Sequence, residues 1–193
     1  MGIIIFVRHG QSKSNVTNTL SSDLGVYPLT EEGIRQTEAF AKTIPRIAKI
    51  DSFCTSPVLR AAQTAEIIGK RIGIKPTIDD RLREWGMGNL NNIVFPSQTA
   101  IDDAITKEVE SGFKGGMEKW KDMQDRMKSF AYSVDGVTLA VTHQGPLMSL
   151  LGTIDRRYDH FSPAVKIANA SATTIDFKNM KLLSIGSPTF PRL

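Results

Sequence analysis

The chain has 193 residues, of which 40% are hydrophobic and 23% are charged, and its formal net charge at pH 7 is +4. This length and composition are typical of one soluble globular domain, or of one domain with an insertion, and no repeat, coiled-coil or low-complexity pattern is present. The lysines and arginines are spread along the chain rather than grouped, so we expect a local anion site and no nucleic-acid surface.

The cysteine content and the N-terminus bear on the cellular location. The single cysteine, Cys54, excludes a disulfide within the chain and is interpreted as a small core residue. The N-terminal apolar run is too short for a secretory signal or a membrane span. Met1-Gly2 does not open a myristoylation motif, because Phe6 stands where Ser or Thr is needed. We therefore expect a cytoplasmic protein with no membrane partner.

The first predicted element is a strand. Residues 3–7 are all apolar, and Arg8, His9 and Gly10 follow directly. Unbroken hydrophobicity predicts a strand that is covered on both faces, as in a parallel sheet. Open α/β sheets carry their functional loops beyond the carboxyl ends of such strands. We therefore expect His9 at that edge of the sheet.

Two helices with a short strand between them are predicted next. Thr30 followed by two glutamates indicates the N-cap and first turn of a core-facing helix. Residues 51–55 are a strand candidate, and Ser56 and Pro57 then indicate the N-cap and first position of a second helix. Arg60 falls in the first turn of this helix, just past a strand end. This position places it at the same sheet edge as His9.

The pattern weakens after a third strand candidate at residues 75–79. We interpret residues 86–116 as a cap inserted over the sheet edge in a single domain that spans residues 1–193, with a short helix around Ile101 and Ile105. A strongly amphipathic helix follows, and we expect its methionine-rich stripe to pack in the core. The positions of the stripe are Met117, Trp120, Met123, Met127, Phe130, Ala131 and Val134.

The final part of the chain repeats the pattern of the first. Residues 137–142 form another apolar strand candidate, and His143 follows directly. Two of the three histidines thus follow the two clearest buried strands, which favours one shared site over unrelated structural roles. The third, His160, adjoins no strand end and is interpreted as a surface or structural residue. Residues 171–177 and 181–185 predict an antiparallel pair, and the last eight residues are expected to be loose.

Two arginines and two histidines at one sheet edge form a pocket that suits a phosphoryl group. Arginine forks match phosphate oxygens, and Arg8, Arg60 and His143 would stabilise the charge on the equatorial oxygens in the transition state. Cationic neighbours disfavour protonation of His9, which leaves a neutral imidazole able to attack phosphorus. Glu84, beside Trp85 in the loop after the third strand, is the candidate general acid.

A metal site is the alternative interpretation of two histidines. Arg8 adjoins His9 and would repel a dication, and no carboxylate lies within several residues of either histidine. We therefore expect no metal and no other cofactor, and a small phosphorylated metabolite as the binding partner.

A set of short motifs resembles the histidine phosphatase superfamily, the phosphoglycerate mutase-like enzymes. The resemblance spans residues 3 to about 151 and implies a three-layer α/β sandwich with a mostly parallel central sheet and a small cap after the third strand. The motifs, in order, are Arg8-His9-Gly10-Gln11-Ser12 with Asn15, Pro28-Leu29-Thr30 with Gly33 and Gln36, Ser56-Pro57 with Leu59-Arg60-Ala61 and Gln63-Thr64-Ala65, Leu82 with Glu84 and Gly86, and Thr142-His143 with Gly145.

The resemblance also implies roles for individual residues. It implies that His9 is phosphorylated during turnover and that Glu84 donates a proton. Three further residues, Arg8, Arg60 and His143, would bind the phosphoryl group. Additional substrate-binding candidates in the same loops are Asn15, Gln11, Ser12, Gln144 and Gly145.

The chain departs from the family pattern at positions that bear on the substrate. Asn91-Asn92 stand where many members have Glu-Gly, Gln144 stands where glycine is common, and Ser14 stands where cofactor-dependent mutases usually have tryptophan. The long arginine-bearing cap insertion of those mutases is missing. The candidate cations around the cap, several of which we expect to face solvent, are Lys107, Lys114, Lys119, Lys121 and Arg126.

These departures favour a metal-independent phosphomonoester hydrolase with a phosphohistidine intermediate. A cofactor-dependent phosphoglycerate mutase is the alternative, because the same histidine can serve either reaction. A non-catalytic module that binds phosphorylated ligands is a third possibility, although both a nucleophile and an acid candidate are present in His9 and Glu84.

Overall fold

The structure is a computed structural model that describes residues 2–45, 49–158 and 165–192. Its centre is a six-stranded sheet with the order β3-β2-β4-β1-β5-β6. Strands β1 to β4 run parallel, and β5 and β6 add an antiparallel edge. The mostly parallel sheet is therefore confirmed. The strands are β1 (Ile3–Arg8), β2 (Ser52–Thr55), β3 (Thr77–Ile78), β4 (Val137–Thr142), β5 (Ala172–Asp176) and β6 (Lys181–Ser187).

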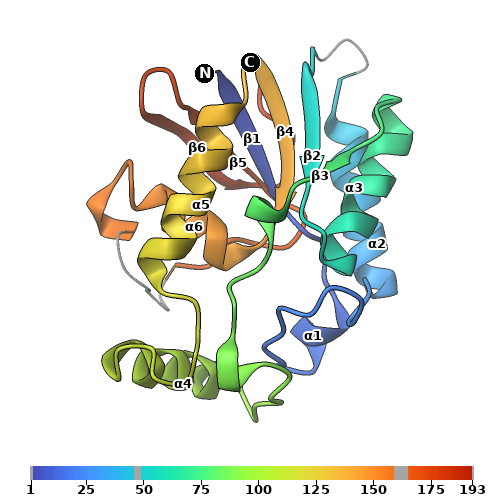
Figure 1. Cartoon of the computed structure of the whole chain (residues 1–193). Helices are drawn as coiled ribbons and strands as arrows, with labels where there is room; N and C mark the ends of the chain where they lie inside the picture. Colours follow the sequence, from blue (N-terminus) through green and yellow to red (C-terminus); the bar gives the residue numbers. More distant parts are fainter. Residues whose placement is uncertain (1, 46–48, 159–164, 193) are drawn as a thin grey trace.

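Helices cover both faces of the sheet, which confirms the three-layer α/β sandwich (Figure 1). Helices α2 (Glu31–Thr43) and α3 (Leu59–Ile72) lie on one face. Helices α5 (Trp120–Ser133) and α6 (Gln144–Leu151) lie on the other. No helix among residues 2–45, 49–158 and 165–192 is long and apolar enough to cross a membrane.

The central strand β1 shows why its sequence is apolar without interruption. Ile4 and Phe6 belong to the core that α5 and α6 cover. Ile5 and Val7 belong to the core under α2 and α3. All four side chains are fully buried. Successive side chains of a strand point to opposite faces of the sheet, and here each face is covered by a separate layer of helices.

Residues 86–116 lie beyond the carboxyl ends of the parallel strands, where α4 (Gln98–Glu110) runs across the lower end of the molecule (Figure 1). A third apolar cluster joins this segment to the rest of the fold. Its buried members are Trp85, Met87, Ile101, Ile105, Met117 and Met123. The remaining short helices are α1 (Lys13–Val16), η1 (Asp80–Leu82), η2 (Gly88–Leu90) and η3 (Arg156–Tyr158).

Several local predictions need correction. Helix α3 begins at Leu59 rather than at Pro57, because the backbone of Val58 is extended. The Ser56 hydroxyl accepts from Val58 N at 3.2 Å and contacts the imidazole of His143 at 2.8 Å. The C-terminal segment is fixed as far as Phe190, whose backbone N donates to Thr43 Oγ1 at 2.8 Å and whose ring is buried. The prediction for His160 falls outside the described residues.

The methionine-rich stripe of α5 divides between two clusters. Met127, Phe130 and Ala131 pack in the main core, as expected. Met123 packs with segment 86–116 instead, and Met117 precedes the helix. The helix thus joins the sheet and this segment.

The loop that follows β1 lies directly against the start of α2. A Cβ atom on Gly10 would lie 2.4 Å from Gly33 O, and one on Gly33 would lie 1.9 Å from Gln11 O. Thr30 caps α2, as predicted, by accepting from Gly33 N at 3.0 Å, and its own N donates to Gln11 O at 2.9 Å. The α2 terminus therefore fixes the loop that carries His9.

Candidate active site

Neighbouring strands bring two histidines together at the carboxyl edge of the sheet. Arg8 on β1 pairs with Thr142 on β4, so His9 and His143 follow at the same level. His9 N donates to Thr142 O at 3.1 Å, and the centroids of the two imidazole rings are 5.1 Å apart. Both side chains are buried, with 2% of His9 exposed. The structure thus places these residues together, as the sequence pattern predicted.

Hydrogen bonds fix the tautomer of His9. Its Nδ1 lies 2.7 Å from the Gly10 carbonyl, which only accepts, so Nδ1 carries the proton. Arg60 Nε donates to His9 Nε2 at 3.1 Å, so Nε2 holds the lone pair. Burial and then the charges of Arg60 and Arg8 lower the pKa of His9 well below its usual value, although the Gly10 carbonyl opposes this. The imidazole is therefore neutral, with its nucleophilic nitrogen beside a cation.

Arg60 connects His9 to Glu84. The guanidinium, with only 3% of the residue exposed, donates from Nη2 to Ser21 O at 3.0 Å and to Glu84 Oε2 at 3.2 Å. Burial lowers the pKa of Arg60, while Glu84 opposes that change. Glu84 Oε1 accepts from Trp85 N at 2.9 Å, which fixes the other carboxylate oxygen. The nucleophile and the proton-donor candidate thus share one cationic neighbour.

Arg8 is held from the opposite side by the N-terminal turn of α6. Its Nη1 donates to Gln144 Oε1 at 3.0 Å and also to the carbonyl of Ile167. Gln144 Oε1 accepts in addition from Ile167 N at 3.3 Å. Burial lowers the pKa of Arg8 to about 10, so the guanidinium remains charged at neutral pH. Gln144, one of the departures from the family pattern, therefore orients Arg8.

Three buried polar nitrogens at this edge have no hydrogen-bond partner among the described residues. They are Arg8 Nε, Arg60 Nη1 and His143 Nδ1. His143 Nε2 lies 2.8 Å from Ser56 Oγ, and a hydroxyl donating to Nε2 leaves the proton on Nδ1. Unpaired buried donors cost free energy, so three of them at one place indicate a site built for a ligand with several acceptor oxygens. A phosphoryl group has this chemistry.

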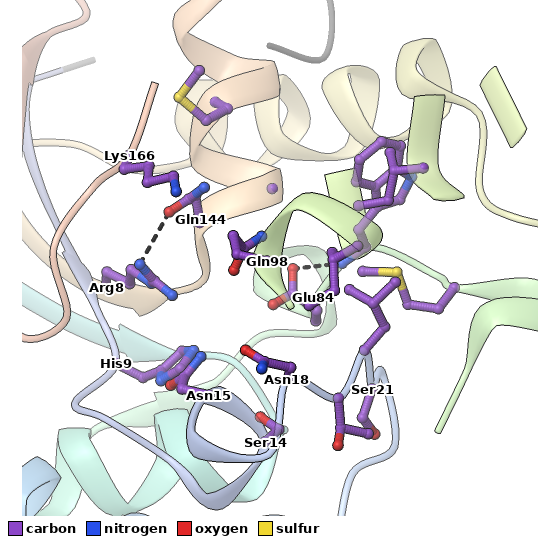
Figure 2. A pocket seen from close by; sticks show the side chains of 18 of the residues that line it. Arg8, His9, Ser14, Asn15, Asn18, Ser21, Glu84, Gln98, Gln144 and Lys166 are labelled. Carbon is purple, nitrogen blue, oxygen red and sulfur yellow. Dashed lines mark hydrogen bonds between the residues drawn. The ribbon is translucent and has the colours of Figure 1, made fainter. Parts of the chain in front are cut away.

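The edge opens into a cavity of about 330 Å³ (Figure 2). The predicted site residues that line it are Arg8, His9, Asn15, Arg60, Glu84, Gln144 and Gly145. Other predicted residues do not line it. His143 lies behind the wall, with Nδ1 3.4 Å from Glu84 Oε2. Gln11 Oε1 accepts from Thr30 Oγ1 at 2.8 Å, and Ser12 is fully buried against Ser14.

Much of the wall was not predicted from the sequence. Asn169 Nδ2 donates to His9 O at 3.0 Å and lies 3.4 Å from Asn15 Oδ1, yet no strand end or motif marks its position. Ile101 and Ile105 were predicted to share a helix face, but spacing alone does not reveal what that face meets. Further lining residues without a sequence signal are Asn18, Thr19, Leu20, Ser21, Trp85, Met87, Gln98, Asp102, Trp120, Met148 and Lys166.

The donor types at the site include a possible metal-binding set. Candidate ligand atoms of His9, Glu84 and His143 all lie within 4.8 Å of one another. No carboxylate lies within several residues of either histidine along the chain, but the fold brings Glu84 to them from a distant loop. However, Arg60 donates to His9 Nε2 and to Glu84 Oε2, which are the lone pairs that a metal needs. The cation in this position disfavours a second cation.

A buried ion pair lies behind Glu84. Arg126 on α5 donates to Glu118 through Nε at 2.7 Å and Nη2 at 2.9 Å, and the two side chains are 10% and 12% exposed. Arg126 also donates to the carbonyls of Arg81, at 2.6 Å, and Glu84, at 3.2 Å. Glu118 Oε2 accepts from Gly86 N at 3.2 Å. Of the five candidate cations around the cap, Arg126 does not face solvent, because it anchors the backbone that carries Glu84.

The family model and the curated relatives that match this chain point to the same family. Residues 4–184 match the family model described as "Histidine phosphatase superfamily (branch 1)". A 2,3-bisphosphoglycerate-dependent phosphoglycerate mutase of Thermoplasma acidophilum is 32% identical over 189 residues, covering 97% of this chain and 93% of the relative.

Solved structures share the fold. YhfR of Bacillus stearothermophilus is similar with a TM-score of 0.79 and 24% identity, covering 96% of each chain. A mycobacterial glucosyl-3-phosphoglycerate phosphatase in complex with VO3 is similar with a TM-score of 0.72 and 23% identity, covering 91% of this chain and 93% of that chain.

Replacing Arg126 tests the anchor behind Glu84. Arg126→Met removes the shortest partner of the largely buried Glu118, which keeps only Arg83 at 3.5 Å and the donation from Gly86 N, and it also removes the donors to two backbone carbonyls. We expect a loss of about 2 kcal/mol in the free energy of unfolding, measured by urea titration. Lys121→Met removes a lysine of the same helix whose partner is the exposed Asp125, and should cost less than about 1 kcal/mol. Equal losses in the two variants would show that Arg126 is an ordinary surface residue.

The protonation state of His9 can be observed by imidazole ¹⁵N NMR. Since burial and two cations lower the pKa of His9, its neutral form persists as pH falls through the usual histidine range, and protonation occurs only at lower pH. At about pH 5.5, one unit below an unperturbed histidine, we expect the pattern of a neutral Nδ1–H tautomer. The signal is assigned from its loss in His9→Asn. A titration midpoint near 6.5 contradicts the electrostatic argument.

Proposed function

Because the chain belongs to the histidine phosphatase superfamily, branch 1, we propose that it is a metal-independent phosphomonoesterase that acts through a phosphohistidine intermediate. One observation carries the proposal: a neutral His9 holds its Nε2 lone pair beside the Arg60 guanidinium at the end of a cavity. A neutral imidazole can attack phosphorus, and the adjacent cations attract the phosphoryl oxygens toward it.

The first half of the reaction transfers the phosphoryl group to the protein. His9 Nε2 forms a bond to phosphorus as the ester P–O bond breaks, and the departing oxygen takes a proton from Glu84. Arg8 and Arg60 bind the equatorial oxygens, and His143 donates to one of them from Nδ1 once the phosphoryl group displaces Glu84 Oε2 from its place 3.4 Å from that nitrogen. The carbonyl of Gly10 accepts from Nδ1–H of His9 throughout and stabilises the positive charge that develops on the ring.

The second half releases inorganic phosphate. Glu84, now a carboxylate, removes a proton from a water molecule as the water oxygen bonds to phosphorus and the P–Nε2 bond breaks. This restores a neutral His9 and a protonated Glu84. The same two cations serve both half-reactions, because each passes through a trigonal phosphoryl group.

Rapid-quench trapping tests the intermediate. With a ³²P-labelled phosphomonoester, we expect label that is stable to base and labile to acid on the wild-type chain and none on His9→Ala. Arg60→Ala should remain folded and lower kcat/KM by about 10² to 10³, the effect typical of one preorganised donor. Equal labelling of wild type and His9→Ala would overturn the assignment of the nucleophile. Absence of both label and turnover would favour a non-catalytic binding module.

A phosphoglycerate mutase is the second candidate, and the name of the Thermoplasma acidophilum relative favours it. A mutase must hold a bisphosphorylated intermediate away from water, which requires a second anion site and a closing lid. The exposed lysines at 107, 114, 119 and 121 are not among the residues that line the cavity, and Lys166, which does line it, lies on the side of Arg8 (Figure 2) and not in segment 86–116. Hydrolysis is therefore the reaction that we propose.

Product analysis separates the two activities. We expect the protein to release inorganic phosphate from phosphomonoesters faster than it converts 3-phosphoglycerate to 2-phosphoglycerate, with or without 2,3-bisphosphoglycerate. Fast interconversion that depends on priming by bisphosphoglycerate, with slow phosphate release, would replace the phosphatase proposal by the mutase one.

Chelation tests the proposed independence from metal. Because Arg60 supplies the positive charge next to His9 and Glu84, we expect phosphate release to be unchanged in 5 mM EDTA, to within about 20%. Complete loss of activity in EDTA, with recovery on adding a single divalent ion, would mean that the His9, Glu84 and His143 set binds a metal.

A further inference from the structure

The cavity is chemically different at its two sides. Figure 2 shows Lys166 on the side of Arg8 and Gln144, and Glu84 on the opposite side. The backbone next to Lys166 clamps Arg8 through Ile167, so this side belongs to the phosphoryl group. A leaving oxygen must lie beside its proton donor. The alcohol part of the substrate therefore extends from Glu84 and away from Lys166.

The wall on the Glu84 side is apolar. Trp85, Met87, Ile101 and Ile105 are buried members of the cluster that joins segment 86–116 to the rest of the fold, and each also lines the cavity. Leu20 and Trp120 pack against this cluster and line the same space. A surface of this composition binds hydrocarbon or aromatic groups by burying them from water.

One charged group from α4 lines this wall. Asp102 lies one position after Ile101, and its Oδ1 accepts from Gln98 Nε2 at 2.9 Å. Among the described residues Asp102 forms no ion pair. The cations that line the cavity are Arg8 and Lys166, which lie on one side (Figure 2), and Arg60, which pairs with Glu84. Asp102 thus brings to the cavity a carboxylate that none of these three cations pairs with.

This inference rests on the proposed function. We propose that the substrate is the monophosphate ester of a small alcohol whose body is apolar and whose distal end carries no second anionic group. That distal end presents an ammonium or hydroxyl donor to Asp102. A carboxylate at that end would meet the like charge of Asp102 beside a low-polarity wall, where repulsion is screened less than in water. The cavity volume of about 330 Å³ is near the lower limit for small-molecule sites, which suits a compact ester.

A matched series of phenyl phosphates tests this selectivity. The para substituent is ethyl, 2-aminoethyl or 2-carboxyethyl, which changes the charge of the distal end while the reacting end stays the same. At pH 7 we expect kcat/KM for the carboxyethyl ester to be at least ~10-fold below that of the ethyl ester, and the aminoethyl ester to equal or exceed the ethyl ester. This comparison uses only the wild-type protein and does not depend on any variant folding.

Two neighbouring substitutions on α4 locate the effect. Asp102→Asn should reduce the ratio of kcat/KM for the aminoethyl and carboxyethyl esters at least ~5-fold. Asp103→Asn removes the same charge from an exposed residue that does not line the cavity, and should leave this ratio within about 2-fold. Equal changes in the two variants would assign the selectivity to overall charge and overturn the role of Asp102.

The series also separates this inference from the proposed function. If the wild type hydrolyses the carboxyethyl ester as well as the ethyl ester, the substrate class is wrong while the phosphatase activity stands. If the folded protein hydrolyses none of the three esters and forms no phosphohistidine with them, the proposed function itself fails.

Discussion

The site depends on a buried guanidinium that two different groups share. Arg60 donates to the lone pair of the nucleophile candidate and to the carboxylate of the acid candidate, in a position that is almost closed to solvent. Burying a cation there costs free energy of desolvation, and the interactions with Glu84 and with the Ser21 carbonyl offset that cost. In the proposed reaction an incoming phosphoryl anion would accept from Arg60 Nη1, which has no partner among the described residues, while Nη2 keeps these two. The protein therefore holds its donors in position before the ligand arrives, so little reorganisation is needed during the reaction.

The scaffold around Arg60 follows from two packing requirements. Strands β1 and β4 are buried on both faces and must lie side by side, which places His9 next to His143. Glycines at positions 10 and 33 allow the β1 loop to contact the α2 terminus, where any side chain would collide with backbone. The loop is thus fixed from one side by α2 and from the other by Asn169, which donates to the carbonyl of His9.

The sequence predicted the strands, the sheet class and the proximity of the two histidines. An unbroken apolar run predicts a strand buried on both faces, and the residues that follow parallel strands lie at one edge of the sheet. The sequence did not predict contacts made by polar side chains across long distances. Ser56 was interpreted as a helix cap, and its hydroxyl also contacts His143, while Arg126 was grouped with the candidate cations of the cap but pairs with Glu118. In both cases the local pattern suited the expected role, and a partner far along the chain determined the observed one. The cavity wall formed by Ile101, Asp102 and Ile105 is hidden for the same reason, since helical periodicity identifies a face but not its neighbour.

The topology of the sheet also governs the order in which this protein can form during synthesis. Strand β1 precedes the other five strands of the sheet in the chain, yet its hydrogen-bonding neighbours are β4, which begins at Val137, and β5, which begins at Ala172. A nascent chain that has not reached Val137 therefore carries an apolar strand with both edges unpaired. Such edges are sites of aggregation, and pairing across so long a separation in sequence slows folding. The alignment of His9 and His143 therefore waits until β4 has been made, and the sheet around β1 is complete only when β5 has followed.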